Sequence, residues 1–239
     1  MSDTPKFSVL IPVFNEERIL ESSIHRLSEY LSIHLPGSEI IIIDNGSTDR
    51  TSEIAKILSA CLPSITFLQI PSRGPGNAIK EGIKAAKGDY IVTLDADLSS
   101  DLLFIDYVKD LSRHADLIIG CKTMGNQRRT LFRLIASHLY ITFAQWLFDL
   151  SISDYSIGVK AFRRSLVFPY VEHLDPWTGY ILELVLICRK NGGRILQIGI
   201  DCEDKRESRF NLLYEGFYRA WHLLKIKGKL KDIQKILAV

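Results

Sequence analysis

The sequence has few of the residues that mark a disulfide-stapled or zinc-binding protein. Its 239 residues include only four cysteines, Cys61, Cys121, Cys188 and Cys202, and no two of them form a C-x-x-C pair. The six histidines show no H-x-x-x-H spacing, so no zinc site is predicted. We therefore expect small, mostly buried cysteines in a reducing compartment.

Long apolar runs and an excess of one charge are also missing. No window of about 20 residues is free of polar groups, and residues 1–17 have no apolar segment after a basic start, so neither a spanning helix nor a signal peptide is predicted. The segment nearest to a span, residues 134–152, carries His138, Gln145 and Asp149, which fits a buried or interfacial helix better. The net charge of +2 gives no reason to expect nucleic acid as a partner.

Apolar runs alternate with segments of helical periodicity. Residues 7–14, 38–44, 65–70 and 90–94 predict buried strands, whereas residues 16–34, 51–62 and 78–86 predict helices and residues 72–77, SRGPGN, a loop. No linker or repeat divides the chain. This order predicts a single α/β domain around a mostly parallel sheet covered on both faces.

Polar residues follow three of these strands, at the edge where such sheets bind ligands. They are Asn15 with Glu16, the D-N-G-S of residues 44–47, and Asp95 with Asp97. Two carboxylates around one small residue suit Mg²⁺ or Mn²⁺, which takes one or two protein carboxylates and leaves positions for phosphate oxygens. This predicts a metal–diphosphate site, although a D-x-D by itself also occurs where the acids cap a helix or face water.

Phosphatases of the haloacid-dehalogenase type offer an alternative, because they also have D-x-D after an apolar strand. In those enzymes the motif ends the first strand of the chain, and a Thr or Val normally follows two residues after the second Asp. Here the motif ends the fourth strand and continues as Asp97-Leu98-Ser99. No acidic pair further along the chain is well placed, so this alternative is disfavoured.

Four segments in series carry a more specific signal: SVLIPVFNEE (8–17), EIIIIDNGSTDRT (39–51), RGPGNAIKEGIKAAKGDYIVTLDADLS (73–99) and DYSIGVKAFRR (154–164). Their order and spacing resemble inverting nucleotide-sugar glycosyltransferases of the GT-A fold, most of all dolichyl-phosphate mannose synthase and related polyprenyl-phosphate glycosyltransferases. The resemblance covers residues 7–209. It implies a GT-A α/β fold, with a Rossmann-like, mostly parallel sheet and helices on both faces.

The resemblance also implies a nucleotide-sugar site, made of Pro12, Phe14, Glu16, Asp44, Asn45, Arg73, Asp95, Ala96, Asp97, Lys205 and Arg206. Within this set Asp95 and Asp97 hold Mg²⁺ or Mn²⁺ against the diphosphate, and Asp97 is the principal ligand. The loop with Arg73 lacks the G-K-[ST] ending of a P-loop, so its glycines are expected to serve a turn and close packing.

Asn45 departs from the family pattern, which usually has a second Asp at this position. An amide also accepts a hydrogen bond but carries no charge, so GDP and UDP both remain possible as the donor nucleotide. Alternatively, Asn45 serves only the backbone of the turn.

An anionic acceptor needs cations to hold it rather than a general base to activate it. By resemblance to the dolichyl-phosphate synthases, Lys122 and Arg133 with Ser137 bind the acceptor phosphate, and Arg129 and Arg209 are expected to assist them. Arg133 and Ser137 stand four residues apart, which puts them on one face of a helix. The alternative is a solvated basic face. Residues 201–210 resemble the family segment that closes over the diphosphate, but they are shorter and lack its glycine.

Two further acids match family positions near the chemistry. Glu183 matches a residue that some relatives use as a base, and Asp154 matches an Asp near the sugar. Two alternatives remain for Glu183: it orders the acceptor loop, or it forms an ion pair with a buried Arg. With Asp97, these residues complete the predicted catalytic set.

A polyprenyl acceptor is confined to a membrane, and two segments suit a membrane surface. Residues 134–152 are rich in aromatic side chains, and residues 217–237 alternate lysines with apolar residues after Tyr218 and Trp221. The alternative is that residues 217–237 form a surface helix that packs against the domain and does not bind a membrane. We expect a GT-A domain over residues 1–215, a basic amphipathic segment over 216–239, and a peripheral protein on the cytosolic face of a membrane, with a membrane-embedded partner protein as a further possibility.

The predicted function is inverting, metal-dependent transfer of a hexose from GDP-mannose or a UDP-sugar to polyprenyl or dolichyl phosphate. One alternative keeps this chemistry and changes the acceptor to a hydroxyl of a glycan, a protein or a small molecule. Another alternative is a catalytically silent binding module on the same fold. The basic residues after position 121 disfavour the first, and the intact D-x-D disfavours the second.

Overall fold

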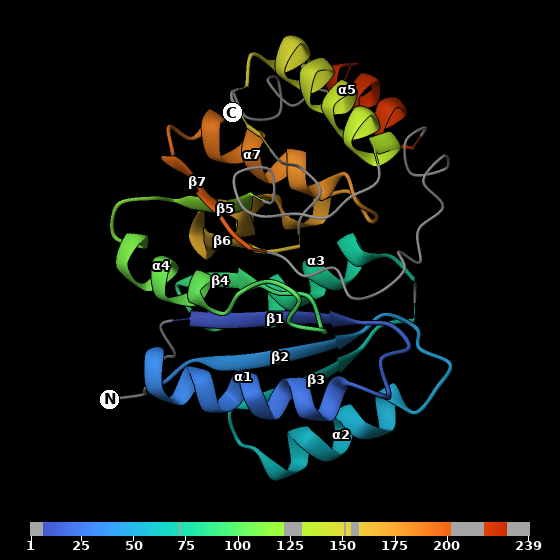
Figure 1. The fold of residues 1–239 in the computed structure, drawn as a ribbon, viewed down its shortest axis with the longest axis vertical. Helices are drawn as coiled ribbons and strands as arrows, with labels where there is room; N and C mark the ends of the chain where they lie inside the picture. Colours follow the sequence, from blue (N-terminus) through green and yellow to red (C-terminus); the bar gives the residue numbers. More distant parts are fainter. Residues whose placement is uncertain are drawn as a thin grey trace.

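The fold is known from a computed structural model, which describes residues 7–71, 73–121, 131–150, 152–153, 158–201 and 218–228, with only the backbone over 131–139. These residues form a seven-stranded sheet in the order β3-β2-β1-β4-β6-β5-β7 (Figure 1). The strands are β1 (Phe7–Val13), β2 (Glu39–Asp44), β3 (Ile65–Gln69), β4 (Tyr90–Thr93), β5 (Leu117–Cys121), β6 (Lys160–Arg163) and β7 (Ile195–Gly199).

Helices occupy most of the connections between the strands. They are α1 (Leu20–His34), α2 (Thr51–Cys61), α3 (Pro75–Ala85), α4 (Leu103–Leu111), α5 (Leu131–Phe148), α6 (Arg164–Val167), the 3₁₀ helix η2 (Phe168–His173) and α7 (Tyr180–Lys190). A further helix covers residues 218–228 and is called the 218–228 helix below.

One strand runs against the others in this sheet. The pairs β1–β2, β2–β3, β1–β4 and β5–β7 are parallel, whereas β6 pairs antiparallel with both β4 and β5. The predicted α/β class with a mostly parallel sheet is therefore confirmed. Because β6 is antiparallel, the residues that precede it lie next to the residues that follow β4.

The central strands are buried along their whole length, which explains why they read as unbroken apolar runs. Every residue of β2, β4 and β5 is buried, including the four isoleucines of residues 40–43. Successive strand residues point to opposite faces, so consecutive burial means that both faces of the sheet are covered. In α3, Gly82 has no side chain, and this lets the helix lie directly against Leu10 and Ile43.

The helix boundaries differ from the predicted ones at two sites. α3 begins at Pro75, within the segment predicted as a loop, because proline suits the first turn of a helix, where its missing N–H costs nothing. α1 begins at Leu20 rather than at Glu16, and residues 16–19 form a turn in which the Glu16 carbonyl accepts the Leu20 N–H at 3.0 Å.

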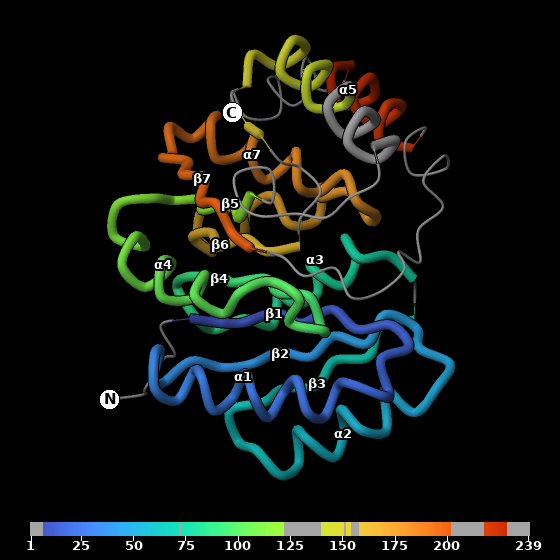
Figure 2. The backbone as a smooth tube through the Cα atoms, viewed as in Figure 1, coloured from blue at the N-terminus to red at the C-terminus, as the bar shows by residue number. Residues whose placement is uncertain are grey.

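The chain gathers its late segments at one end of the molecule. Figure 2 follows the backbone from the blue β1–β3 region to α5 and the red 218–228 helix, which lie side by side at the opposite end from α2. Within the part of the chain that is described, no helix has both the length and the hydropathy to cross a bilayer. The predicted domain boundary at 215 and 216 falls outside the described residues and stays a prediction.

Candidate active site

The loops after β1 and β2 are joined by hydrogen bonds at the carboxyl edge of the sheet. Asn15 adopts a left-handed backbone conformation with φ of 55°, and its side-chain oxygen accepts the Thr48 N–H at 2.8 Å. Its own N–H donates to the Ser47 hydroxyl at 2.9 Å, and the Glu16 N–H donates to the Thr51 hydroxyl at 2.7 Å. These bonds give the first two polar clusters of the sequence a fixed relative position.

Asp44 is the last residue of β2 and Asn45 follows it, and their side chains make different hydrogen bonds. The buried Asp44 carboxylate accepts the Ser47 N–H at 3.0 Å on one oxygen and the Ser52 hydroxyl on the other. The Asn45 side-chain oxygen accepts the Gly74 N–H at 2.6 Å. A neutral amide here avoids a second buried carboxylate beside Asp44, where like charges would repel. The amide therefore joins the end of β2 to the loop before α3 without adding a charge.

Two glycines let the loop before α3 lie against the backbone of residues 175–177. A Cβ on Gly74 would stand 2.3 Å from the Pro176 carbonyl oxygen, and one on Gly76 would stand 2.0 Å from the Asp175 carbonyl oxygen. Gly74 also has a φ of 155°, and the Asn77 N–H donates to the Pro176 oxygen at 3.1 Å. The glycines thus serve a turn and close packing, as predicted.

A cavity of about 210 Å³ opens where these loops meet. The Arg73 guanidinium lies 4.2 Å from the centre of the Phe14 ring, in cation–π geometry, so these two side chains form one wall. The cavity is lined by Pro12, Val13, Phe14, Glu16, Asn45, Arg73, Pro75, Ile79, Thr93, Leu94, Asp95, Gly158, Trp177 and Tyr180. Six of the eleven predicted nucleotide-sugar residues are in this set.

Asp95 lies in the cavity against Gly158, the residue that leads into β6. A Cβ on Gly158 would stand 2.2 Å from Asp95 Oδ1, and the Thr93 hydroxyl donates to the Gly158 carbonyl oxygen. Burial, and then the Asp95 carboxylate, raise the pKa of the Tyr180 hydroxyl. Tyr180 is therefore a neutral hydroxyl near Asp95.

Asp97 and Ala96 follow Asp95 but are not among the residues that line the cavity. Ala96 is buried, and Asp97 is partly exposed, with Oδ1 accepting the Ser99 N–H at 3.1 Å. The described residues contain no cluster of three or more His, Cys, Asp or Glu that would hold a metal ion unaided. A pair of strand-end carboxylates, one of them cradled by a glycine, fits a divalent ion that takes the rest of its ligands from water and phosphate.

Glu183 lies near the start of α7 and does not line the cavity. Its Oε2 accepts the Asp175 N–H, and its Oε1 is 3.3 Å from His222 Nε2. A side chain with these contacts orders the loop that contains Asp175. The contacts therefore favour a loop-ordering role for Glu183 over a role as catalytic base. Catalysis by Glu183 remains an untested prediction.

The other predicted site residues cannot be compared with the structure. Asp154, Lys122, Arg129, Lys205, Arg206 and Arg209 lie outside the described residues. Arg133 and Ser137 stand in α5, one helical turn apart, where the backbone alone is described. Their roles remain predictions.

Sequence reasoning missed the aromatic wall of the cavity. Trp177 and Tyr180 come from a segment, DPWTGY, that sequence analysis did not assign to a site. Gly158 stood inside the DYSIGVKAF segment but was not assigned a role. Gly158 lies beside Asp95 because β6 runs antiparallel to β4. In the sequence, the only indication of its role was its position in the DYSIGVKAF segment.

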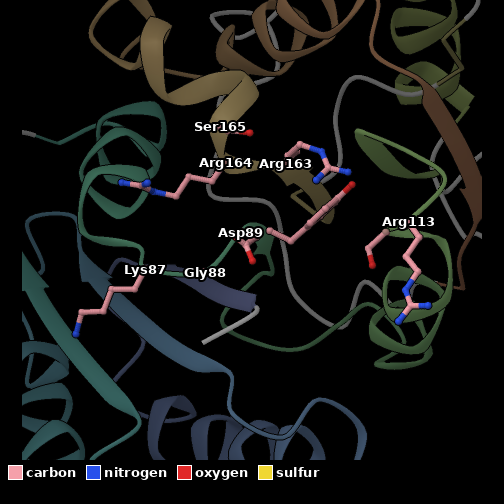
Figure 3. A pocket seen from close by; sticks show the side chains of 9 residues that line it. Lys87, Gly88, Asp89, Arg113, Arg163, Arg164 and Ser165 are labelled. Carbon is pink, nitrogen blue, oxygen red and sulfur yellow. The ribbon is translucent and has the colours of Figure 1, made fainter. Parts of the chain in front are cut away.

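A second cavity, of about 320 Å³, lies at the other edge of the sheet (Figure 3). It is lined by Lys87, Gly88, Asp89, Tyr90, Ser112, Arg113, Arg163, Arg164 and Ser165. Figure 3 shows the charged ends of Lys87, Arg113 and Arg164 extending away from one another. The Arg163 guanidinium is paired with Asp116 at 3.0 Å. These cations do not converge on one ligand position, so we assign the active site to the smaller cavity.

Residues 8–168 match the protein family described as glycosyl transferase family 2. The chain is 30% identical over 164 residues to the undecaprenyl-phosphate 4-deoxy-4-formamido-L-arabinose transferase of Yersinia pestis. These residues cover 68% of this chain and 50% of that protein. It is 25% identical over 246 residues to glycosyltransferase AglD of Haloferax volcanii, with 97% and 39% covered. The chain thus spans half or less of the length of these two relatives.

A third relative is similar over nearly the whole length of this chain. The dolichyl-phosphate beta-glucosyltransferase of Dictyostelium discoideum is 27% identical over 256 residues, which cover 98% of this chain and 78% of that protein. Among solved structures, glucosyl-3-phosphoglycerate synthase of Mycobacterium tuberculosis, in complex with Mn²⁺, UDP and glucosyl-3-phosphoglycerate, superposes with a TM-score of 0.70 at 21% identity, covering 94% of this chain and 80% of that one. The fold is therefore GT-A, as the resemblance implied.

The contact between Gly158 and Asp95 gives a testable expectation. Gly158→Ala adds a methyl group where the Asp95 carboxylate lies, so the carboxylate must move. We expect the affinity for Mn²⁺ with UDP or GDP to fall by about tenfold or more, equivalent to 1.4 kcal/mol. Isothermal titration calorimetry measures this change. Gly228→Ala, at a glycine with no atoms within 4 Å of the added carbon, is the matched control. Unchanged affinity in Gly158→Ala would remove Asp95 from the metal site.

Proposed function

Because the chain belongs to glycosyl transferase family 2, we propose that it transfers a sugar from a nucleotide diphosphate sugar to a polyprenyl phosphate. The observation that carries this proposal is that Asp95 lines a cavity together with Phe14, Arg73 and Asn45, with Asp97 two residues further on. A strand-end acidic pair beside polar and aromatic walls suits a metal-bound nucleoside diphosphate.

Asp95 and Asp97 are the residues that would bind Mg²⁺ or Mn²⁺ on the diphosphate of the donor. A divalent ion bound there supplies positive charge against the negative charge that develops on the leaving nucleoside diphosphate. The glycine at position 158 leaves space for the Asp95 carboxylate, and the rigid end of β4 fixes its direction.

The residues that line the cavity suit two parts of the donor, the nucleoside and the sugar. The Phe14–Arg73 wall, with Pro12, Glu16 and Asn45, offers an aromatic face and hydrogen-bonding groups for the nucleoside. Trp177 and Tyr180 also line the cavity, with Tyr180 near Asp95, and we assign both to the sugar. Asp44 supports this site by ordering the turn after β2, and Asp154 is expected beside the sugar.

The acceptor phosphate attacks the anomeric carbon while the bond to the diphosphate breaks, which inverts the configuration at that carbon. A phosphate oxygen is already anionic at neutral pH, so no side chain has to remove a proton from it. This agrees with the contacts of Glu183, which faces the Asp175 N–H and His222 rather than the cavity. Lys122, Arg129, Arg133, Ser137 and Arg209 are the residues proposed to bind the acceptor phosphate.

The names of the relatives support a lipid phosphate acceptor. The Yersinia and Dictyostelium proteins are named for transfer to undecaprenyl phosphate and to dolichyl phosphate. The latter is a glucosyltransferase whose length this chain covers to 78%, so glucose is preferred over mannose as the sugar. A UDP-sugar and GDP-mannose are both to be tested as donors.

A surface of exposed apolar side chains supports docking on a membrane. It consists of Phe143 and Trp146 of α5 with Trp221 and Leu224 of the 218–228 helix, and it is called the aromatic face below. Trp146 is 74% exposed, Trp221 is 55% exposed and Leu224 is 59% exposed.

Lysines border this face. Lys227 Nζ lies 5.5 Å from the Trp146 ring centre, and Lys225 Nζ lies 4.7 Å from that of Trp221. Aromatic side chains with flanking cations are typical of segments that lie in the interface of an anionic membrane. We therefore propose a peripheral protein on the cytosolic face of a membrane.

The metal assignment predicts a large effect of one carboxylate. Asp97→Ala should lower kcat for sugar transfer by about a hundredfold or more, because the charge on the leaving group is no longer offset. The fold should remain cooperative in thermal unfolding, since Asp97 is partly exposed. Asp110→Ala, at an exposed position of α4, is the control. Full activity of Asp97→Ala, or of the wild type in excess EDTA, would contradict the metal site.

The acceptor assignment predicts a selective effect of Arg133. A charge-assisted hydrogen bond contributes roughly 1.5–3 kcal/mol, so Arg133→Ala should raise the acceptor KM or lower turnover by about tenfold or more. Donor affinity should change little. Steady-state kinetics with each substrate varied in turn separates the two effects, and Arg26→Ala, on the exposed side of α1, is the control. An equal loss of donor affinity would assign Arg133 to the nucleotide.

The aromatic face predicts binding to vesicles. Replacing Trp146 and Trp221 by Ser should weaken binding to phosphatidylglycerol-containing vesicles by about tenfold or more, equivalent to 1.4 kcal/mol. Added salt should weaken wild-type binding, because the bordering lysines contribute about 1 kcal/mol each near an anionic surface. Vesicle co-sedimentation measures both effects.

The control for this experiment is Ile33→Ser with Ile57→Ser, which removes two exposed apolar residues from α1 and α2. It should leave vesicle binding unchanged. If the wild-type chain ignores anionic vesicles at low salt, the aromatic face does not dock on lipid, and a membrane-embedded partner would have to present the acceptor.

A further inference from the structure

His222 is a buried histidine held between two carboxylates. It stands on the inner side of the 218–228 helix and is only 2% exposed. Its Nε2 lies 3.4 Å from Asp175 Oδ1 and 3.3 Å from Glu183 Oε1. Gly179 makes room for it, because a Cβ there would stand 2.3 Å from His222 Cε1. The imidazole is thus fitted into a space that any other residue at position 179 would fill.

Asp175 is the centre of a network of hydrogen bonds around this histidine. Its Oδ2 accepts the N–H groups of Trp177 at 3.0 Å and Gly179 at 2.9 Å, and its Oδ1 accepts the Tyr218 hydroxyl at 2.6 Å. Two residues of the 218–228 helix, Tyr218 and His222, therefore contact one carboxylate that folds the loop over residues 175–179.

This loop forms part of the active-site cavity. Trp177 lines it directly, Tyr180 follows the loop at the start of α7, and the Pro176 oxygen accepts the Asn77 N–H. A change in the loop would therefore move Trp177, which lines the same cavity as Asp95. It would also loosen the contact with Gly76, whose missing side chain lets the two backbones meet.

The same helix carries half of the aromatic face on its outer side. Trp221 and Leu224 are exposed, whereas His222, Leu223 and Ile226 are buried. The helix lies beside α5, with Arg219 over the Tyr140 ring at 5.8 Å (Figure 1). One short helix therefore contacts the proposed membrane surface on one side and the loop of the active site on the other.

We infer that His222 is a positioning residue that couples membrane docking of the 218–228 helix to nucleotide binding in the cavity. Docking holds the helix in place, His222 and Tyr218 then hold Asp175, and Asp175 orders the loop that carries Trp177. The inference rests on the proposed function, because it takes the cavity as the donor site and the aromatic face as the lipid contact. It adds regulation: the enzyme binds its donor best on the membrane that contains its acceptor.

His222→Gln tests this coupling, with His25→Gln on the exposed side of α1 as the matched control. Affinity for UDP or GDP with Mn²⁺ is measured with and without phosphatidylcholine vesicles that contain phosphatidylglycerol and no polyprenyl phosphate. In the wild type and His25→Gln, vesicles should tighten nucleotide binding by about fivefold or more, the lower range of allosteric couplings. His222→Gln should still bind vesicles but lose this increase. An equal increase in His222→Gln, or none in a wild type that binds both vesicles and nucleotide, would overturn the inference.

Hydrogen exchange separates this inference from the proposed function. The amides of Trp177 and Gly179 donate to Asp175, so their protection should fall by about tenfold in His222→Gln relative to neighbouring amides of α7. This result needs no nucleotide and no activity. Unchanged protection would show that His222 does not order the loop. A wild type that binds no nucleotide would instead contradict the donor site, whatever the exchange result.

Tyr218→Phe covers the case in which His222→Gln does not fold, and Glu183→Gln tests the contact with His222 where that variant does fold. Tyr218→Phe removes only the hydroxyl bonded to Asp175, so it should cause a smaller loss of the same amide protection. Glu183→Gln removes one of the two carboxylates around His222. In a double-mutant cycle, the loss of amide protection caused by Glu183→Gln should be smaller when residue 222 is Gln than when it is His. Additive effects in the cycle, or full protection in Tyr218→Phe, would count against the network.

Discussion

The contact between the Asp95 carboxylate and Gly158 sets the geometry on which the rest of the site depends. Asp95 comes at the end of β4, and Gly158 comes just before β6, which pairs antiparallel with β4. In an all-parallel sheet the residues before the neighbouring strand would lie at the opposite edge. Reversing one strand therefore brings a glycine beside the acidic motif, and the absent side chain leaves space for a carboxylate and its ligand.

Two hydrogen bonds, one of them from a side chain, then hold three loops around this contact. Asn45 binds the Gly74 N–H, and the Asn77 N–H binds the Pro176 oxygen, so the ends of β2, the start of α3 and the loop before α7 form a connected wall. The first connection depends on the Asn45 amide beside the buried Asp44. The second depends on Gly74 and Gly76, because a side chain at either position would keep the two backbones apart. The cavity is thus a product of loop-to-loop contacts on a rigid sheet.

Much of this arrangement could be predicted from the sequence, because it follows from local patterns. The apolar runs predicted the strands β1 to β4, and the polar residues after them predicted the edge that carries the cavity. Trp177, Tyr180 and Gly158 could not be found in this way, since only the pairing of β6 and the packing of the 175–179 loop bring them to the cavity that Asp95 lines. His222 was hidden for the same reason: the tail read as a basic surface segment, and its inner side became visible only once the helix was packed against Asp175.

The central claim is that the nucleophile is a lipid phosphate, and a pair of acceptors tests it directly. Radiolabelled UDP-glucose and GDP-mannose are each incubated with the protein, Mn²⁺, and vesicles containing either polyprenyl phosphate or the matching polyprenol. The account predicts that label from one donor enters the lipid fraction only with polyprenyl phosphate, and that EDTA abolishes the transfer. Equal transfer to the polyprenol, or transfer to soluble hydroxyl acceptors with none to the lipid phosphate, would contradict it.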